Sequence, residues 1–209
     1  MKLSTWLFPF AALFGSANTF AATAPLSDYL SCGAQSFSVV AQAPFKSLIS
    51  NKLENGHIKL QGGSKSDMGQ RWIFDKPVVV DDISLTGFFA EDIDLMGSRI
   101  INWGFYAQQS PEQIAASLKK SHTLDLLVSN NIFARPEIWS EQQLAWLPET
   151  SGETAGKLVT DTSERILMVE PAPGDLAGSK GMLTCSIQGK ISEAALKSSR
   201  PDLLSTPQG

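Results

Sequence analysis

Apolar and polar residues alternate along much of the chain, which is the period-two pattern of β-strands with one buried face. The pattern is clearest in residues 83–90 and 99–107. In the second segment Ile101, Trp103 and Phe105 fall at every second position, so we expect them on one face of a strand. Because aromatic and β-branched residues favour strands, these segments are predicted to form the centre of a sheet.

Turn signals separate further strands. Asn55-Gly56 lies between two short alternating segments and predicts a hairpin. Residues 36–42 have a strand-like pattern, and residues 78–90 are interpreted as one long or kinked strand in which Gly87 marks a bulge or a close approach. Three more strands are predicted near the C-terminus, at residues 157–161, 165–170 and 182–189.

Two segments carry the start signals of helices. Ser110 and Gln113 provide an N-cap and its capping-box partner around a proline at the first helical position. Ser140 and Gln143 repeat this spacing and predict a second, shorter helix. Residues 192–199 are expected to form one or two helical turns.

This order of elements, strands then helices then strands, indicates an α+β fold. We expect a single domain over residues 22–209, with a mostly antiparallel sheet and two or three short helices packed on one face. The polar tail from about residue 200 is expected to fray.

The first 21 residues have the composition of a cleaved signal peptide. Lys2 precedes an apolar run from Trp6 to Phe14, and Ala21 ends a pattern suited to cleavage. The run is shorter than the roughly 20 residues that a membrane-spanning helix needs. Export to the periplasm or the medium is therefore expected, without membrane insertion.

The only cysteines of the chain are Cys32 and Cys185. Neither belongs to a Cys-x-x-Cys motif, and an isolated pair in an oxidising compartment is most simply a disulfide. We predict that this bond joins the first and last strands of the domain.

The net charge of the whole chain is −4, and it becomes −5 when Lys2 is removed with the signal peptide. A mildly acidic chain lacks the basic surface that binds nucleic acid or anionic lipid. If the protein has a protein partner, we expect a basic one.

Residues 88–98, FFAEDIDLMGS, form the densest chemical group of the sequence. Asp92, Asp94 and Gly97 match the first, third and sixth positions of an EF-hand loop. The fifth and twelfth positions are Met96 and Trp103, neither of which can ligate calcium. A calcium site is therefore not expected, and no other metal or cofactor is assigned.

Signatures of enzymes are missing from the sequence. It contains no Gly-x-Ser-x-Gly, His-Glu-x-x-His, Walker or Gly-x-Gly-x-x-Gly motif, and its only histidines are His57 and His122. A hydrolase that cleaves envelope glycans or peptides with a carboxylate pair stays an alternative. Its candidate residues are Asp81, Asp82, Glu91, Asp92 and Asp94, with Trp72 and Trp103 as platforms for a sugar ring.

The leading hypothesis is an exported, non-enzymatic binding protein, for example an inhibitor or an immunity protein that blocks an enzyme or a toxin. We expect Glu91-Asp92 at the tip of a hairpin, where acidic and apolar side chains would project together. The residues assigned to partner binding are Phe88, Phe89, Glu91, Asp92, Asp94 and Met96. The alternative is that the apolar members of this group turn inward and cover the end of the sheet.

Overall fold

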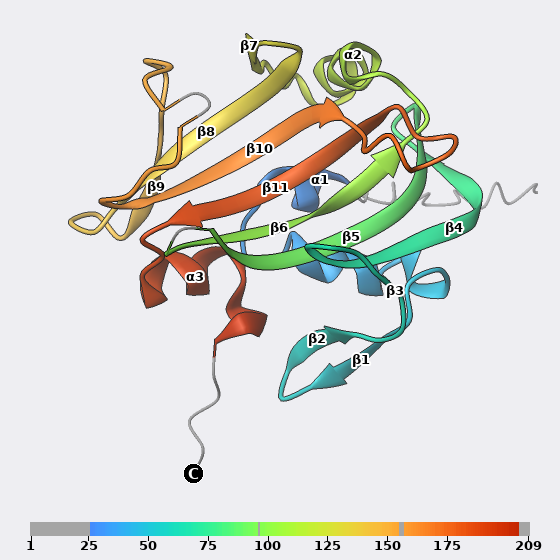
Figure 1. Cartoon of the computed structure of the whole chain (residues 1–209), viewed down its shortest axis with the longest axis horizontal. Coiled ribbons are helices and arrows are strands. Elements are labelled where there is room, and N and C mark those ends of the chain that lie inside the picture. The colour runs from blue at the N-terminus through green and yellow to red at the C-terminus, as the bar shows by residue number, and fades with distance from the viewer. Residues whose placement is uncertain (1–25, 96, 155–156, 205–209) are drawn as a thin grey trace, which may run out of the picture.

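A large antiparallel sheet forms most of the protein (Figure 1). The computed structural model describes residues 26–95, 97–154 and 157–204. The strands are β1 (Asn51–Glu54), β2 (His57–Leu60), β3 (Ser64–Lys65), β4 (Gly69–Val80), β5 (Ile83–Leu95), β6 (Ser98–Ala107), β7 (Leu127–Ser129), β8 (Ile132–Ser140), β9 (Ala145–Pro148), β10 (Ser163–Pro171) and β11 (Gly181–Gly189). Nine strands form the sheet in the order β3-β4-β5-β6-β11-β10-β8-β7, with β9 also paired to β8, while β1 and β2 form a separate hairpin.

Short helices contribute the rest of the regular structure. They are α1 (Leu26–Leu30), α2 (Pro111–His122), α3 (Glu193–Ser199) and the 3-10 helices η1 (Phe37–Ala41), η2 (Phe45–Ser47) and η3 (Pro201–Leu203). Figure 1 shows α1 behind the sheet. The apolar side chains of α1, α2 and α3 belong to one core cluster with side chains of the sheet. The expectation of a mostly antiparallel sheet with short helices is confirmed, although the sheet dominates and the helices of the described residues form no continuous layer over it.

The core is built on the sheet face that carries Trp103 and Phe105 of β6. Phe105 lies at its centre, with ring centroids 4.6 Å from Phe45, 5.0 Å from Phe88 and 5.2 Å from Tyr29. All of these side chains are fully buried. The predicted alternation of Ile101, Trp103 and Phe105 is therefore confirmed, and their shared face is the core face.

The predicted disulfide between Cys32 and Cys185 is confirmed, and both residues are fully buried. Cys185 lies on β11, the last strand, as expected. Cys32 does not lie on a strand, because it follows α1 in a turn with a positive φ of 49°. The bond therefore fastens the N-terminal segment that covers the core to the centre of the sheet.

Residues 78–90 do not form one strand, so that expectation is wrong. β4 ends at Val80, and a tight turn of Asp81 and Asp82 leads into β5, with φ values of 50° and 63°. Positive φ at both central residues is typical of the hairpin turns that match the twist of a sheet. Of the two alternatives at Gly87, a bulge is confirmed by a shift in the pairing register between Leu85 and Gly87.

Residues 36–42 form η1 instead of a strand, because Phe37, Val39 and Val40 all turn into the core. Ser140 ends β8, and residues 141–144 form the turn between β8 and β9 rather than a helix, with Leu144 at a φ of 48°. Residues 157–161 form no strand. The helix α2 has the predicted capping box of Ser110 and Gln113.

Ordered packing extends past the start of the polar tail. Arg200 and Asp202 are buried and form an ion pair with a distance of 2.8 Å. The expected signal peptide, residues 1–21, and the last five residues lie outside the described residues. Among the residues described, no helix is long and apolar enough to cross a membrane.

Candidate functional site on the open face of the sheet

The second face of the sheet, which we call the open face, carries polar and apolar side chains together. Asn102 of β6 pairs with Ser186 of β11, which pairs in turn with Ile166 of β10. Because neighbouring residues of a strand point to opposite faces, these three lie opposite the core residues Trp103 and Leu167.

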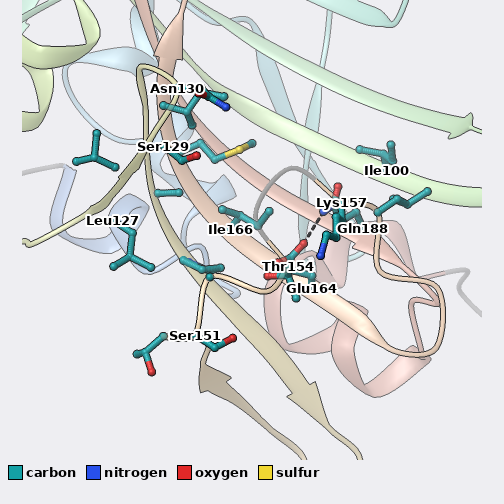
Figure 2. Close-up of a pocket in the computed structure, with 18 of the residues that line it drawn as sticks. Ile100, Leu127, Ser129, Asn130, Ser151, Thr154, Lys157, Glu164, Ile166 and Gln188 are labelled. Atoms are coloured by element: carbon teal, nitrogen blue, oxygen red, sulfur yellow. Dashed lines mark hydrogen bonds between the residues drawn. The ribbon is translucent and has the colours of Figure 1, made fainter.

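An elongated cavity of about 690 Å³, which we call the apolar groove, lies on this face. Figure 2 shows Leu127, Ser129 and Asn130 along one side, Ile100 and Gln188 along the other, and Ile166 between them. Its volume falls within the range of about 300–1,000 Å³ that is usual for ligand sites.

Three of the side chains lining the groove are large, apolar and exposed. Leu95 has an exposed fraction of 50%, Leu127 of 47% and Val128 of 66%. Leu95 ends β5, whereas Leu127 and Val128 belong to the β7–β8 hairpin. Two separate parts of the chain therefore place unburied apolar surface at the same cavity.

A second cavity of about 270 Å³, the acidic pocket, lies beside the groove. Both cavities are lined by Ile100, Met168 and Gln188, so they adjoin one another. The acidic pocket is also lined by Met68, Phe89, Glu91, Asn102, Tyr106, Glu170 and Thr184.

Two carboxyl groups line the acidic pocket. Glu91 of β5 is only 8% exposed, and Asn102 Nδ2 donates to its Oε2 at 3.1 Å. Glu170 of β10 accepts a hydrogen bond from Thr184 Oγ1 at 3.2 Å. Burial raises the pKa of Glu170, the hydrogen bond from Thr184 opposes this shift, and the negative charge of Glu91 adds to it. Because the charge of Glu91 influences the pKa of Glu170, the two carboxyl groups interact electrostatically across the pocket.

A third carboxyl group, that of Glu164, lies at the groove and is only 1% exposed. Gln188 Nε2 donates to its Oε2 at 2.5 Å, the contact drawn as a dashed line in Figure 2. Burial is the main cause that raises the pKa of Glu164, and the charge of Glu149 acts in the same direction. The open face thus carries three largely buried carboxyl groups on two strands.

The outer wall of the acidic pocket is aromatic. Phe89 and Tyr106 stack with ring centroids 4.9 Å apart. The guanidinium of Arg71 lies over the Tyr106 ring at 5.9 Å and forms an ion pair with Asp175 at 2.8 Å. Burial raises the pKa of Tyr106 to about 12, with Arg71 opposing and Glu91 reinforcing the shift.

The structure separates the residues predicted to form one binding loop. Glu91 and Asp92 do not top a hairpin, because β5 continues to Leu95 and the turn follows it. Phe88 is fully buried in the core, while Phe89 and Glu91 line the acidic pocket.

The other predicted binding residues lie elsewhere. Asp92 accepts two hydrogen bonds from Arg99, at 2.8 and 2.6 Å, on the opposite face from Glu91. Asp94 Oδ1 accepts from the backbone N–H of Gly97 at 2.9 Å and so stabilises the turn. Met96 lies outside the described residues. No single surface made of all these side chains is found in the part of the chain that the structure describes.

The other sequence candidates are also dispersed. Asp81 bonds to His122 at 2.9 Å and Asp82 to Lys120 at 2.8 Å, both beside the β4–β5 turn. Trp72 and Trp103 are 6% and 0% exposed, so neither offers a platform for a sugar ring. That part of the hydrolase alternative is wrong.

Glu164 and Glu170 are not among the site residues expected from the sequence, although the alternating pattern of β10 indicates that they share one face. In β10 Glu164, Ile166, Met168 and Glu170 alternate with residues that are buried in the core. Carboxyl groups at both ends of such an alternating row share one face of the sheet.

Comparison with models of known protein families, with curated proteins and with solved structures found no match to this chain. Within the described residues, no group of three or more histidine, cysteine, aspartate or glutamate side chains is arranged to hold a metal ion.

Proposed function

We propose that this chain is an exported binding protein that holds an apolar ligand in the groove on the open face of its sheet. One observation carries the proposal, namely the place where exposed apolar side chains gather. Nine large apolar side chains are exposed in the described structure, and four of them line the two adjoining cavities. These four are Met68, Leu95, Leu127 and Val128.

Exposed apolar surface that collects at a concavity is typical of ligand or partner sites, whereas single exposed apolar residues are common on any protein. The floor of the groove contributes further apolar surface from Ile166 and Met168. A ligand seated there would remove this surface from water, which provides about 25 cal/mol for each Å².

Export is supported by two independent features. The N-terminal residues have the pattern of a signal peptide, and the disulfide between Cys32 and Cys185 requires an oxidising environment to persist. Expression of the whole chain in a bacterium, followed by fractionation and mass measurement, tests this part. The expected product is oxidised, lies outside the cytoplasm and begins at Ala22.

The binding proposal is tested with the uncharged dye phenylnaphthylamine, whose fluorescence rises in an apolar environment. The oxidised protein should bind the dye with saturation. Replacing both Leu127 and Val128 by serine removes apolar surface from the groove, so the dissociation constant should rise by about tenfold or more.

A matched control is provided by exposed apolar residues elsewhere on the protein. Leu53 and Val79 have exposed fractions of 71% and 67% and line neither cavity. Their replacement by serine should leave dye affinity unchanged. Equal losses in both double variants would show that the dye reports general surface hydrophobicity, and the groove would then not be the binding site.

A second candidate is the hydrolase with a carboxylate pair, which the interaction of Glu91 with Glu170 favours. A carboxyl group with a raised pKa beside a second carboxyl group suits general acid catalysis. Chromogenic glycosides and peptides of envelope type provide the test. Turnover that is abolished in Glu91→Gln and in Glu170→Gln, and kept in Asp81→Asn, would establish it, and absence of turnover in the unmodified protein would reject it.

A further inference from the structure

The ligand of the groove can be defined further by the acidic pocket. We propose that this pocket binds the cationic group of a small amphiphile whose apolar part lies in the apolar groove. The inference rests on the proposed function, because it needs the groove to be occupied. It adds the chemical class of the ligand and a second site on the same face.

The two cavities adjoin, so one molecule can extend from one into the other. Ile100, Met168 and Gln188 line the groove and the pocket alike, so the two cavities adjoin at these side chains. The larger cavity is bordered mainly by apolar side chains, and the smaller one, of about 270 Å³, has room for a head group. An apolar chain joined to a small polar end matches this division.

The charge of the residues that line the acidic pocket determines which kind of head group the pocket can bind. Glu91 and Glu170 are the acidic side chains among the residues that line the acidic pocket, and none of its described lining residues is a lysine, arginine or histidine. Arg71 lies behind Tyr106 and is paired with Asp175. An anionic head group would meet two carboxyl groups in a partly desolvated site, whereas a cation would be attracted to both.

Hydrogen-bonding capacity at the pocket is also unused. Glu91 is more than nine-tenths buried, yet its Oε1 accepts no hydrogen bond from the described residues. Asn102 Oδ1, on the same wall, is buried and likewise has no donor among them. An acceptor without a protein donor favours a ligand that brings N–H donors, and Glu91 Oε1 provides one at the pocket.

An ammonium or guanidinium group supplies such donors together with a positive charge, and hydrogen bonds between charged groups are about twice as strong as neutral ones. A calcium ion would need six to eight oxygen ligands. The described residues provide no cluster of three carboxylate, histidine or cysteine side chains for a metal. An organic cation therefore fits the pocket better than a bare metal ion.

The test uses three probes that share one alkyl chain and differ in the head group: octylammonium, octanol and octanoate. Binding to the oxidised protein is measured by calorimetry at about pH 7.5, where a free glutamate is ionised. Octylammonium should bind about tenfold tighter than octanol, and octanoate should bind weakest.

Two variants test whether the preference for octylammonium over octanol depends on the carboxyl groups of the acidic pocket. The double variant Glu91→Gln and Glu170→Gln keeps side-chain size and removes both charges, so it should bind octylammonium and octanol about equally. Asp92→Asn is the matched control, since Asp92 is adjacent to Glu91 but faces away from the pocket. It should keep the preference of the unmodified protein. Thermal unfolding of each variant checks that the fold is retained.

The outcomes separate the two proposals. If all three probes bind alike and the glutamine variants change nothing, the cationic ligand is excluded while the groove keeps its binding function. If no probe binds and phenylnaphthylamine does not bind either, the proposed function itself fails. Calcium binding in place of octylammonium, lost in the double glutamine variant, would overturn the inference in favour of a metal site. Binding of a lysine- and leucine-rich peptide without octylammonium would overturn it in favour of a protein ligand.

Discussion

The ring of Tyr106 stacks on that of Phe89, with an interplanar angle of 28° and 4.9 Å between the centroids. These rings come from the adjacent strands β6 and β5 and close the outer side of the acidic pocket. Only 1% of Tyr106 is exposed, and its hydroxyl lies within the electrostatic influence of both Arg71 and Glu91. Ionisation of this tyrosine therefore reports on the charges of the pocket.

The first prediction concerns the two tyrosines of the chain. Burial raises the pKa of Tyr106 to about 12 and that of Tyr29 well above the usual tyrosine value of about 10. At about pH 10.5 the native protein should therefore show little phenolate absorbance. In denaturant at the same pH, more than half of the tyrosine should be ionised.

The variants Glu91→Gln and Tyr106→Phe show which part of the phenolate absorbance comes from Tyr106. Removing the negative charge of Glu91 should lower the pKa of Tyr106, because that charge disfavours phenolate. Tyr106→Phe should abolish the first step of the titration. A native protein that already absorbs strongly near pH 10 would contradict the buried position of both rings.

The second prediction is that the disulfide contributes strongly to stability. Cys32 and Cys185 are 153 residues apart, for which the chain-entropy model gives an upper value of roughly 5 kcal/mol. Replacing both cysteines by alanine should lower the free energy of unfolding by about 2–5 kcal/mol, measured by urea denaturation. A loss below about 1 kcal/mol would mean that the unfolded chain gains little freedom when the bond is absent.

The third prediction concerns the pH dependence of stability through Glu170. Its pKa is raised in the folded protein, chiefly by burial, so folding disfavours the ionised form. The stability linked to this group is fully present below the pKa of the unfolded chain and is lost as the pH rises through the folded pKa. Glu170→Gln should therefore raise the melting temperature at about pH 7, and the gain should vanish near pH 4.

Glu153 provides the control for this measurement, because its side chain is exposed and lines neither cavity. Glu153→Gln should leave the melting temperature almost unchanged at both pH values, as is usual for surface substitutions. A stabilisation of Glu170→Gln that is equal at pH 4 and pH 7 would argue against a charge effect and for a packing effect.

Some elements of the fold could be predicted because local signals and packing agree. The Asn55-Gly56 turn and the capped helix from Ser110 are formed as expected. The same capping pattern at Ser140 fails, because Trp139 packs edge-on against Trp146 across β8 and β9, with centroids 5.1 Å apart. A cross-strand aromatic pair outweighs a capping signal that is worth about 1 kcal/mol.

The candidate site was less accessible to sequence reasoning. The sequence indicates Phe89 and Glu91; their pocket partners Asn102 and Tyr106 come from the next strand, β6, whereas Glu170 comes from β10, far along the chain. The order β5-β6-β11-β10 and its register bring these residues to one face, and a single sequence does not specify that pairing. Phe88 was assigned to the same surface because a linear stretch does not reveal which face each residue takes.

The last prediction links Tyr29 to the disulfide. The Tyr29 hydroxyl donates to the carbonyl oxygens of Trp103 at 3.1 Å and of Leu183 at 2.8 Å, so it joins α1 to β6 and β11. Tyr29→Phe removes this donor and leaves two backbone acceptors without it, which should cost about 1–3 kcal/mol of unfolding free energy.

Tyr29 and Cys32 are also close along the chain, and the backbone N–H of Cys32 donates to the carbonyl oxygen of Tyr29 at 2.9 Å. Both residues hold the same N-terminal segment on the core, so their contributions should not be independent. In a double-mutant cycle, Tyr29→Phe combined with the cysteine-to-alanine pair should lose less stability than the sum of the separate losses. Strict additivity would show that the hydroxyl and the disulfide anchor the segment separately.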